Sequence, residues 1–285
     1  MPCRQALPKP TIFREALRIS VRHATHFEYD TNVDYAVQRL LLTPLNFASQ
    51  HVESWTIRAV GMENALQYFD GFGNAVTLTT FTNHSGPVEI VAEGIVESHD
   101  AQGMVRGLVE MAPVAVYMRQ TNATLPSNKI LQLLPVHSQN LVDPLRELHG
   151  LMFLVHNNVA YLTGVTDSQT TAAEAFERGS GVCQDHAHIF LGLARSLGYP
   201  ARYVTGYLVM GIGAASTASH AWVEVHVRDL GWVGFDVANC ICPTEQYVRV
   251  AAGIDAASVT PVRGSRRGGV AETMTVEVRV EIAQQ

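Results

Sequence analysis

Apolar and polar positions alternate through the first third of the chain. In VRHATHFEYD, residues 21–30, β-branched or ring-bearing residues stand at every second position, and the following Thr31 and Asn32 suit a turn. A period of two is typical of a strand with one buried face. Similar runs follow between turn residues: VESWTIRAV, AVTLTTFTN and VEIVAEGIVES. Several short strands divided by turns predict a β-sandwich over residues 18–98.

Helical spacing replaces this alternation after residue 127. Apolar residues in 145–155 recur every three or four positions, and the preceding Asp143-Pro144 suits an N-cap followed by proline at the first helical position. The segment AAEAFERG predicts a second, short helix. Thr170 or Thr171 could cap it, and Glu174 would complete a capping box with Thr171.

A third helix is expected directly after Gly181. Apolar residues between 187 and 197 follow the i, i+3, i+4, i+7 rule until Gly198-Tyr199-Pro200 ends the helix. Alternating segments then return, and we expect a loop of small residues among them at residues 211–218. We expect four of these segments to form one sheet: ARYVTGYLVM, HAWVEVHV, GWVGFDVA and MTVEVRVEI.

The stretch from residue 99 to about 127 lacks clear periodicity and contains several glycine and proline residues. Such a stretch suits a junction between domains, and a chain of 285 residues is long enough for two. We therefore predict an N-terminal β domain at residues 1–125 and a second domain at 126–285. We expect the β domain to pack beside the second domain without being inserted into it.

Composition narrows the classes of partner. A hydrophobic content of 47% suits a globular protein with a sizeable core, and a net charge of −6 with a pI near 6.0 favours neither nucleic acid nor an anionic membrane surface. The first 20 residues lack the continuous apolar segment of a secretory signal, which predicts a cytoplasmic protein. The four cysteines are too few for a disulfide framework, so we expect free thiols.

Cys183 stands at the predicted start of the third helix, directly after a Gly-Ser-Gly-Val segment. Unpaired backbone N–H groups and the positive end of the helix dipole stabilise an anion at this position. The thiolate is the nucleophilic form of cysteine, so the placement favours a reactive thiol. A small buried cysteine would also fit a helix start, and the choice between the two depends on other residues.

Two such residues follow in the chain. His220 opens one alternating segment and Asp236 comes late in the next, so a hairpin could hold them together. A cysteine nucleophile needs a base within hydrogen-bond reach, and the base needs a group that fixes its tautomer. Cys183, His220 and Asp236 are therefore the candidate catalytic residues.

The spacing of these residues predicts the register of the hairpin. A symmetric two-residue turn at Asp229-Leu230 would pair Asp236 with Val223, which lies on the strand face opposite to His220. That register cannot bring His220 and Asp236 together. We therefore predict a loop of odd length or a β-bulge near Arg228–Gly231. Trp222 should then share the face of His220 and Asp236, and the residues pointing away are Val223, Val225 and Phe235.

Three segments in order closely resemble the core of the bacterial transglutaminase-like superfamily, which shares its catalytic arrangement with papain-like cysteine proteases: GVCQDHAHIFLGLARSLGYPARYVTGYL, HAWVEVHV and GWVGFDVAN. The resemblance implies that Cys183 is the nucleophile, His220 the base and Asp236 the orienting carboxylate. RHATHFEYD, RLLLTPLN and FDGFGN resemble the N-terminal β domain that accompanies this core, and YVRVAAGIDAASVTPVRG resembles the segment after the catalytic Asp. The family often has Pro where this chain has Val237.

The resemblance implies an α+β fold, in which a β-sandwich domain precedes a papain/transglutaminase-like core whose cysteine-bearing helix packs on an antiparallel sheet. It also implies acyl transfer on a peptide or protein amide through a thioester, with no cofactor and no metal. Water as acceptor makes the enzyme a protease or amidase, which we favour. The alternatives are a crosslinking transglutaminase that uses an amine, and a non-catalytic peptide-binding scaffold.

Other candidate residues receive less specific interpretations. We expect Asp185 to cap the start of the cysteine-bearing helix, and His186 to be structural. Cys240 and Cys242 could bind zinc, but the chain lacks a second paired ligand motif, so we interpret them as ordinary thiols. The backbone N–H of Cys183 is one expected oxyanion donor, and the second donor is open between Tyr161, Gly164 and their neighbours.

Overall fold

The computed structural model describes residues 16–134, 143–210, 218–269 and 271–283. The strands of residues 17–98 form the predicted β-sandwich together with two strands from the C-terminal end of the chain. Its two antiparallel four-stranded sheets have the strand orders β15-β1-β6-β3 and β14-β2-β5-β4. The strands are β1 (Leu17–Tyr29), β2 (Val33–Leu40), β3 (Gln50–Arg58), β4 (Leu66–Phe69), β5 (Ala75–His84), β6 (Val88–Ser98), β14 (Val262–Gly268) and β15 (Glu272–Ile282).

Alternation along these strands produces the core of the sandwich. Phe27 and Ile90 from one sheet pack with Leu40 and Phe81 from the other, and all four are buried. Each buried apolar side chain of this size stabilises the fold by roughly 1.5–3 kcal/mol. The residues on the opposite strand faces are on the whole less buried, as the period of two predicts.

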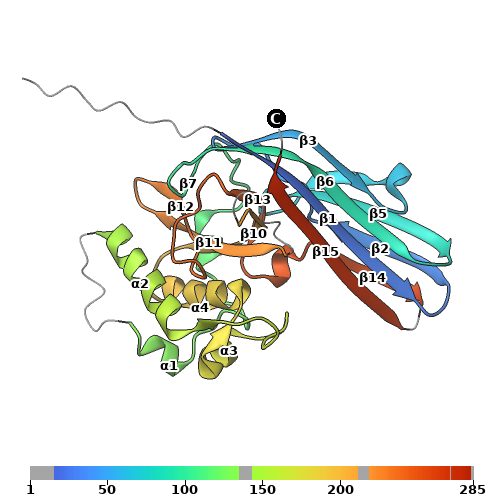
Figure 1. Ribbon diagram of the computed structural model, residues 1–285. Helices are drawn as coiled ribbons and strands as arrows, with labels where there is room; N and C mark the ends of the chain where they lie inside the picture. The colour runs from blue at the N-terminus through green and yellow to red at the C-terminus, as the bar shows by residue number, and fades with distance from the viewer. Residues whose placement is uncertain (1–15, 135–142, 211–217, 270, 284–285) are drawn as a thin grey trace, which may run out of the picture.

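The second part of the chain contains a five-stranded antiparallel sheet with strand order β13-β10-β11-β12-β7. Figure 1 shows the helices gathered beside this sheet, at the end of the molecule away from the sandwich. The strands are β7 (Met104–Val105), β10 (Ala201–Leu208), β11 (His220–Val227), β12 (Gly231–Phe235) and β13 (Tyr247–Gly253). The helices are α1 (Asn128–Leu131), α2 (Pro144–Asn158), α3 (Ala172–Arg178) and α4 (Cys183–Ser196), and β8 (Ala160–Tyr161) pairs with β9 (Ser180–Gly181).

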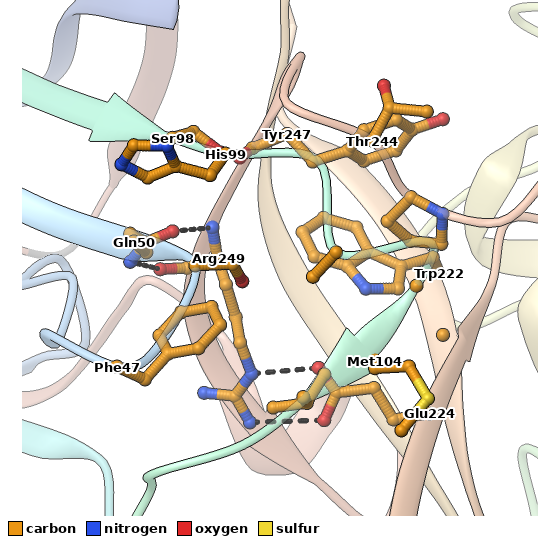
Figure 2. A pocket seen from close by; sticks show the side chains of 16 residues that line it. Phe47, Gln50, Ser98, His99, Met104, Trp222, Glu224, Thr244, Tyr247 and Arg249 are labelled. Atoms are coloured by element: carbon orange, nitrogen blue, oxygen red, sulfur yellow. Dashed lines mark hydrogen bonds and ion pairs between the residues drawn. The ribbon is translucent and has the colours of Figure 1, made fainter. Parts of the chain in front are cut away.

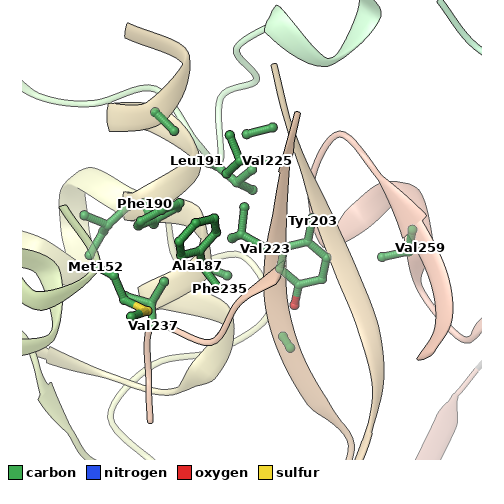
Figure 3. Packing of buried hydrophobic residues seen from close by; sticks show 14 of the residues in the cluster. Met152, Ala187, Phe190, Leu191, Tyr203, Val223, Val225, Phe235, Val237 and Val259 are labelled. Atoms are coloured by element: carbon green, nitrogen blue, oxygen red, sulfur yellow. The ribbon is translucent and has the colours of Figure 1, made fainter. Parts of the chain in front are cut away.

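Helix α4 begins and ends where its sequence predicts, and one face of it packs on the sheet. Phe190 stacks on Phe235 of β12 with ring centroids 5.6 Å apart, and Val223 and Val225 of β11 belong to the same buried cluster (Figure 3). Helices α2 and α3 have the predicted caps. Asp143 accepts from the backbone of α2, and Thr171 and Glu174 form the capping box of α3.

The register of the β11–β12 hairpin is the one that the spacing of His220 and Asp236 predicts. Val223 lies opposite Phe235, and Val227 lies opposite Gly231. The three residues between the strands make a loop of odd length, so the two-residue turn is ruled out. Val223, Val225 and Phe235 accordingly face α4.

Three strand pairings differ from the expected arrangement. We predicted that MTVEVRVEI would join the sheet of the core, but β15 pairs with β1 of the sandwich, and β14 pairs with β2. In the other direction, β7, which lies before the predicted boundary at residue 125, pairs with β12 of the core sheet. A period of two predicts a strand with one buried face, but it does not specify the partner, because either sheet offers a suitable edge.

Two side-chain amides connect the sandwich to the edge strand β13. Gln50 donates to the carbonyl oxygen of Arg249 at 2.9 Å and accepts from its N–H at 2.7 Å. Asn74 makes the same pair of bonds with Ala252, both at 2.8 Å. These amides satisfy backbone groups that an edge strand leaves unpaired, and so they hold the sandwich against the core sheet.

Within the described residues, no helix is long and apolar enough to cross a membrane.

A buried cluster of charges lies on the sheet face away from α4. The fully buried carboxylate of Glu224 accepts from Arg202 at 2.6 Å and from Arg249 at 2.8 Å. Burial alone would raise the pKa of Glu224, but the two guanidinium groups lower it. The carboxylate therefore balances two cations that have little access to water.

We expect Glu224→Gln to lower the free energy of unfolding by about 3–5 kcal/mol, because it leaves two buried guanidinium groups without their shared counter-ion. Urea titration followed by circular dichroism measures this change. The matched control is Glu53→Gln, which breaks a surface pair with Arg18 and should change stability little. Equal effects of the two variants would contradict the prediction.

Candidate active site

Cys183 is the first residue of α4, as predicted, and its side chain is partly buried. The turn before it is held by Asp185, which accepts from the backbone N–H of Val182 at 2.8 Å and from Thr166 Oγ1 at 2.7 Å. Gly181 permits this arrangement, because a Cβ there would lie 2.5 Å from Asp185 Oδ2. Asp185 therefore caps the start of the helix, as predicted, and fixes the turn that leads into Cys183.

His220 and Asp236 meet at the same end of the β11–β12 hairpin. Nε2 of His220 lies 2.6 Å from Oδ2 of Asp236, and the carboxylate is fully buried. The bond occupies Nε2. Cys183 lies close enough to His220 that its hydrogen bonding and charge raise the pKa of the imidazole. The structure thus brings together all three residues that the sequence singled out, and their catalytic role stays a prediction.

The charge state of His220 follows from these contacts. Burial alone would lower its pKa, but the hydrogen bonds and negative charges of Asp236 and Cys183 outweigh burial and raise the pKa to about 10. An imidazolium at neutral pH is the partner that stabilises a neighbouring thiolate. The same proton would be available to a leaving group.

Two further residues hold Asp236, and sequence reasoning missed both. Tyr247 donates its hydroxyl hydrogen to Oδ2 at 2.6 Å, and Asn239 donates through its amide nitrogen at 2.7 Å and its backbone N–H at 3.1 Å. Burial would raise the pKa of Asp236, but the donors lower it, His220 first. Asn239 was the easier of the two to find, since an Asp-x-x-Asn turn places both side chains on one loop.

Aromatic rings surround the His220–Asp236 pair. Trp222 stacks on the imidazole with centroids 6.3 Å apart and meets the ring of Tyr247 edge-on at 5.5 Å. Gly206, opposite His220 on β10, leaves room for this ring, because a Cβ there would lie 2.7 Å from the Trp222 indole. As predicted, Trp222 lies on the face away from α4. Figure 2 shows Trp222 and Tyr247 lining a small cavity of about 40 Å³ behind the site.

Tyr247→Phe should slow alkylation of Cys183 by iodoacetamide at pH 5 and move the acidic limb of its pH profile to higher pH. Tyr247 lowers the pKa of Asp236, so without the hydroxyl this carboxylate takes up a proton earlier as the pH falls. A hydrogen bond to a charged group contributes roughly 1.5–3 kcal/mol, so the rate at pH 5 should fall about tenfold.

Tyr35→Phe, at a half-exposed tyrosine of the sandwich, is the control for this experiment. A purely structural role of Tyr247 would lower stability and leave the pH profile in place. An unmoved acidic limb would therefore refute a role of Tyr247 in positioning Asp236.

The remaining candidates take other places. Both ring nitrogens of His186 lie 2.9 Å from backbone carbonyl oxygens, those of Val159 and Val182, which agrees with a structural role. Tyr161 lies near the thiol, since the charges of Cys183 and Asp236 add to burial in raising the pKa of its phenol. The choice of a second oxyanion donor therefore centres on the Tyr161 region.

No three His, Cys, Asp or Glu side chains in the described part of the chain gather as a metal site would require. Cys240 and Cys242 are free, and burial raises the pKa of both, that of Cys242 to about 11. The absence of zinc from these thiols stays a prediction. The loop predicted at residues 211–218 lies outside the described residues except for its last position, and Cys3 lies outside them as well.

Comparisons with known proteins match the chain in two parts. Residues 137–237 match the transglutaminase-like superfamily, and residues 19–97 match the bacterial transglutaminase-like N-terminal region. An uncharacterized protein from Mycobacterium leprae is 26% identical over 276 residues, which cover 92% of this chain and 98% of that protein. An uncharacterized protein from Mycobacterium tuberculosis is 26% identical over 276 residues and 87% of each chain.

A solved structure shares the fold. It comes from Cytophaga hutchinsonii and is described as a putative cysteine protease. It superposes with a TM-score of 0.74 at 19% sequence identity, over 95% of this chain and 92% of that one. The sandwich and the helix-on-sheet core therefore occur together in both proteins.

Proposed function

Because the chain joins a transglutaminase-like superfamily core to a bacterial transglutaminase-like N-terminal region, we propose that it is a cysteine enzyme that transfers acyl groups from a peptide or protein amide. The observation that carries the proposal is the 2.6 Å bond between His220 and the buried Asp236, beside a thiol at the start of α4. Four donors hold the Asp236 carboxylate behind His220, which in turn contacts Cys183. Peptide binding alone does not require this arrangement, so it favours an enzyme over a binding scaffold.

The proposed reaction begins with attack of Cys183 Sγ on the carbonyl carbon of an amide. A C–S bond forms, and the oxyanion accepts from the backbone N–H of Cys183 and from a second donor near Tyr161. His220 then gives its proton to the amide nitrogen, the C–N bond breaks, and an amine leaves a thioester behind.

The second half of the reaction releases the acyl group. Neutral His220 accepts a proton from the incoming water while the oxygen attacks the thioester carbonyl. The C–S bond breaks, and the products are a carboxylic acid and the regenerated thiolate–imidazolium pair. Asp236 keeps Nε2 protonated throughout, so that Nδ1 exchanges the proton in both halves.

Water is the acceptor that we place first, which makes the enzyme a protease or amidase. The Cytophaga protein of the same fold, with its description as a putative cysteine protease, supports this choice. Transfer to an amine, which would crosslink proteins, uses the same thioester and is the second candidate. We also propose a cytoplasmic location, in keeping with the free thiols at Cys183, Cys240 and Cys242.

Screening a peptide and amide library in the presence and absence of a fluorescent alkylamine tests the proposed function. We expect release of free acid with the amine added, and loss of the signal in Cys183→Ala. Incorporation of the amine in place of acid release would assign the transglutaminase reaction. Binding of peptides without turnover, equal in both proteins, would favour the scaffold and contradict the proposal.

A further inference from the structure

A second cavity lies where the sandwich meets the core sheet, on the face away from α4. Its volume is about 370 Å³, within the range of small-molecule sites. This cavity is separate from the catalytic site. Arg202 at its base pairs with Glu224 of β11, and Glu224 is four residues, or about 13 Å, along that strand from His220.

Apolar side chains from two segments form the wall of this cavity. Phe69 is the last residue of β4, and Phe72 lies in the turn between β4 and β5. Val109 and Met111 come from the irregular segment after β7. Phe69, Val109 and Met111 are each more than half exposed. Large apolar side chains exposed together around one hollow are characteristic of a binding site.

Two guanidinium groups form the polar base, and each has a donor to spare. Arg249 donates hydrogen bonds from Nε and Nη2 to Glu224. No described residue accepts from its Nη1, and Figure 2 shows this nitrogen pointing away from Glu224. Arg202 is 2% exposed, and its buried Nη2 has no hydrogen-bond partner. The ring of Trp232, 3.9 Å from the centre of the Arg202 guanidinium, holds that group in place.

Glu110 is the exposed member of this charge cluster. Its carboxylate lies 3.1–3.2 Å from Arg202 Nη1, longer than the 2.6 Å bond of Glu224, and its side chain is 35% exposed. It belongs to the irregular segment that also carries Val109 and Met111. Glu110 can therefore move into water while Glu224 stays, and a carboxylate that took its place would keep two anions beside two guanidinium groups.

We propose that this cavity binds a molecule in which a carboxylate is joined to an apolar group. The carboxylate replaces Glu110 on Arg202 and accepts from Nη1 of Arg249, and the apolar group lies against Phe72, Val109 and Met111. The site is independent of the proposed acyl transfer, so binding can be measured in Cys183→Ala. Fatty acids and the free C-terminal residue of a peptide both have this chemistry.

Isothermal titration of Cys183→Ala with octanoate tests the proposal, with 1-octanol as the uncharged probe of the same length. We expect octanoate to bind at least about tenfold more tightly than 1-octanol, since charge-assisted bonds to guanidinium are lost in the alcohol. Comparing the affinity of N-acetylleucine with that of N-acetylleucinamide repeats the test for the C-terminal residue of a peptide. Tighter binding of octanoate than of N-acetylleucine would indicate a fatty acid as the ligand, and the reverse would indicate a peptide C-terminus.

Two substitutions test the arrangement of the site. Glu110→Gln removes the competing carboxylate and should tighten octanoate binding about tenfold without changing 1-octanol, whereas Glu177→Gln, at an exposed pair with Lys129, should change neither. Val109→Asp places a negative charge beside the site at an exposed position, so it should weaken the binding of octanoate more than that of 1-octanol. Equal affinity for acid and alcohol, or octanoate binding that neither Glu110→Gln nor Val109→Asp alters, would overturn the proposal.

Discussion

Cys183→Ala should lower the rate of acyl transfer by at least about 10⁴-fold, because the nucleophile of both half-reactions is lost. Water held at the same place cannot form the thioester, and the oxyanion donors alone leave only a small residual rate. The fold should survive, since the side chain of Cys183 is only partly buried and alanine is a good helix former. Turnover of the best peptide from the library, with urea denaturation as the test of folding, measures both effects.

Cys242→Ala is the matched control, because it removes a thiol near the site that the proposed reaction does not use. Burial raises the pKa of Cys242 to about 11, so at pH 7 iodoacetamide should label Cys183 and leave Cys242 unmodified. Mass spectrometry of the alkylated peptides identifies the modified residue. Full turnover in Cys183→Ala, or preferential labelling of Cys242, would remove Cys183 from the mechanism.

Asp236→Asn should lower kcat by about 10⁴-fold while changing KM little, because an amide no longer fixes the tautomer of His220 or balances its charge. The substitution replaces the oxygen at the centre of a tight group: Oδ2 accepts from His220, Tyr247 and the Asn239 amide. An amide nitrogen placed there would face three donors, and an amide oxygen placed there is a weaker acceptor without charge.

The same substitution should change how stability depends on pH. The pKa of His220 is raised from 6.5 to about 10 in the folded protein, so its protonation stabilises the fold fully below about pH 6.5 and less as the pH rises toward 10. Without Asp236 the folded pKa falls, and this loss of stability between pH 7 and 10 should shrink.

Histidine NMR and urea titrations at several pH values measure the pKa of His220 and the stability. Asp34→Asn, at a surface carboxylate 3.9 Å from Arg267, is the control and should leave the His220 titration unchanged. A His220 resonance that titrates near pH 6.5 in the unmodified protein would contradict the buried His220–Asp236 ion pair.

Much of the fold could be predicted because its signals are local. Alternation located β1, β5 and β6, and helical spacing with caps located α2, α3 and α4. The hairpin register was also predictable, since bringing His220 and Asp236 onto one face requires either an odd-length connection or a β-bulge, and the structure has a three-residue loop before Gly231. Because side chains alternate between the two faces of a strand, the requirement that two residues share a face strongly constrains the strand register.

The support of Asp236 could not be predicted in the same way. Tyr247 lies eleven residues beyond Asp236, at the start of β13, and reaches the carboxylate only because β13 pairs with β10 on the far side of β11. The sequence around Tyr247 carries no motif for this contact. Its position depends on the order of strands in the sheet, which is a property of the whole chain.

The sequence by itself determined the position of the thiol at a helix start, the identity of the histidine and carboxylate, and the strands that carry them, because these depend on short-range spacing and on the chemistry of side chains. Tertiary structure alone decided that β15 completes the sandwich, that Glu224 balances Arg202 and Arg249, and that Glu110 contacts Arg202 in the second cavity. These pairings are made where burial removes water from charged or unpaired groups, and only the packed chain determines which partners are then within reach.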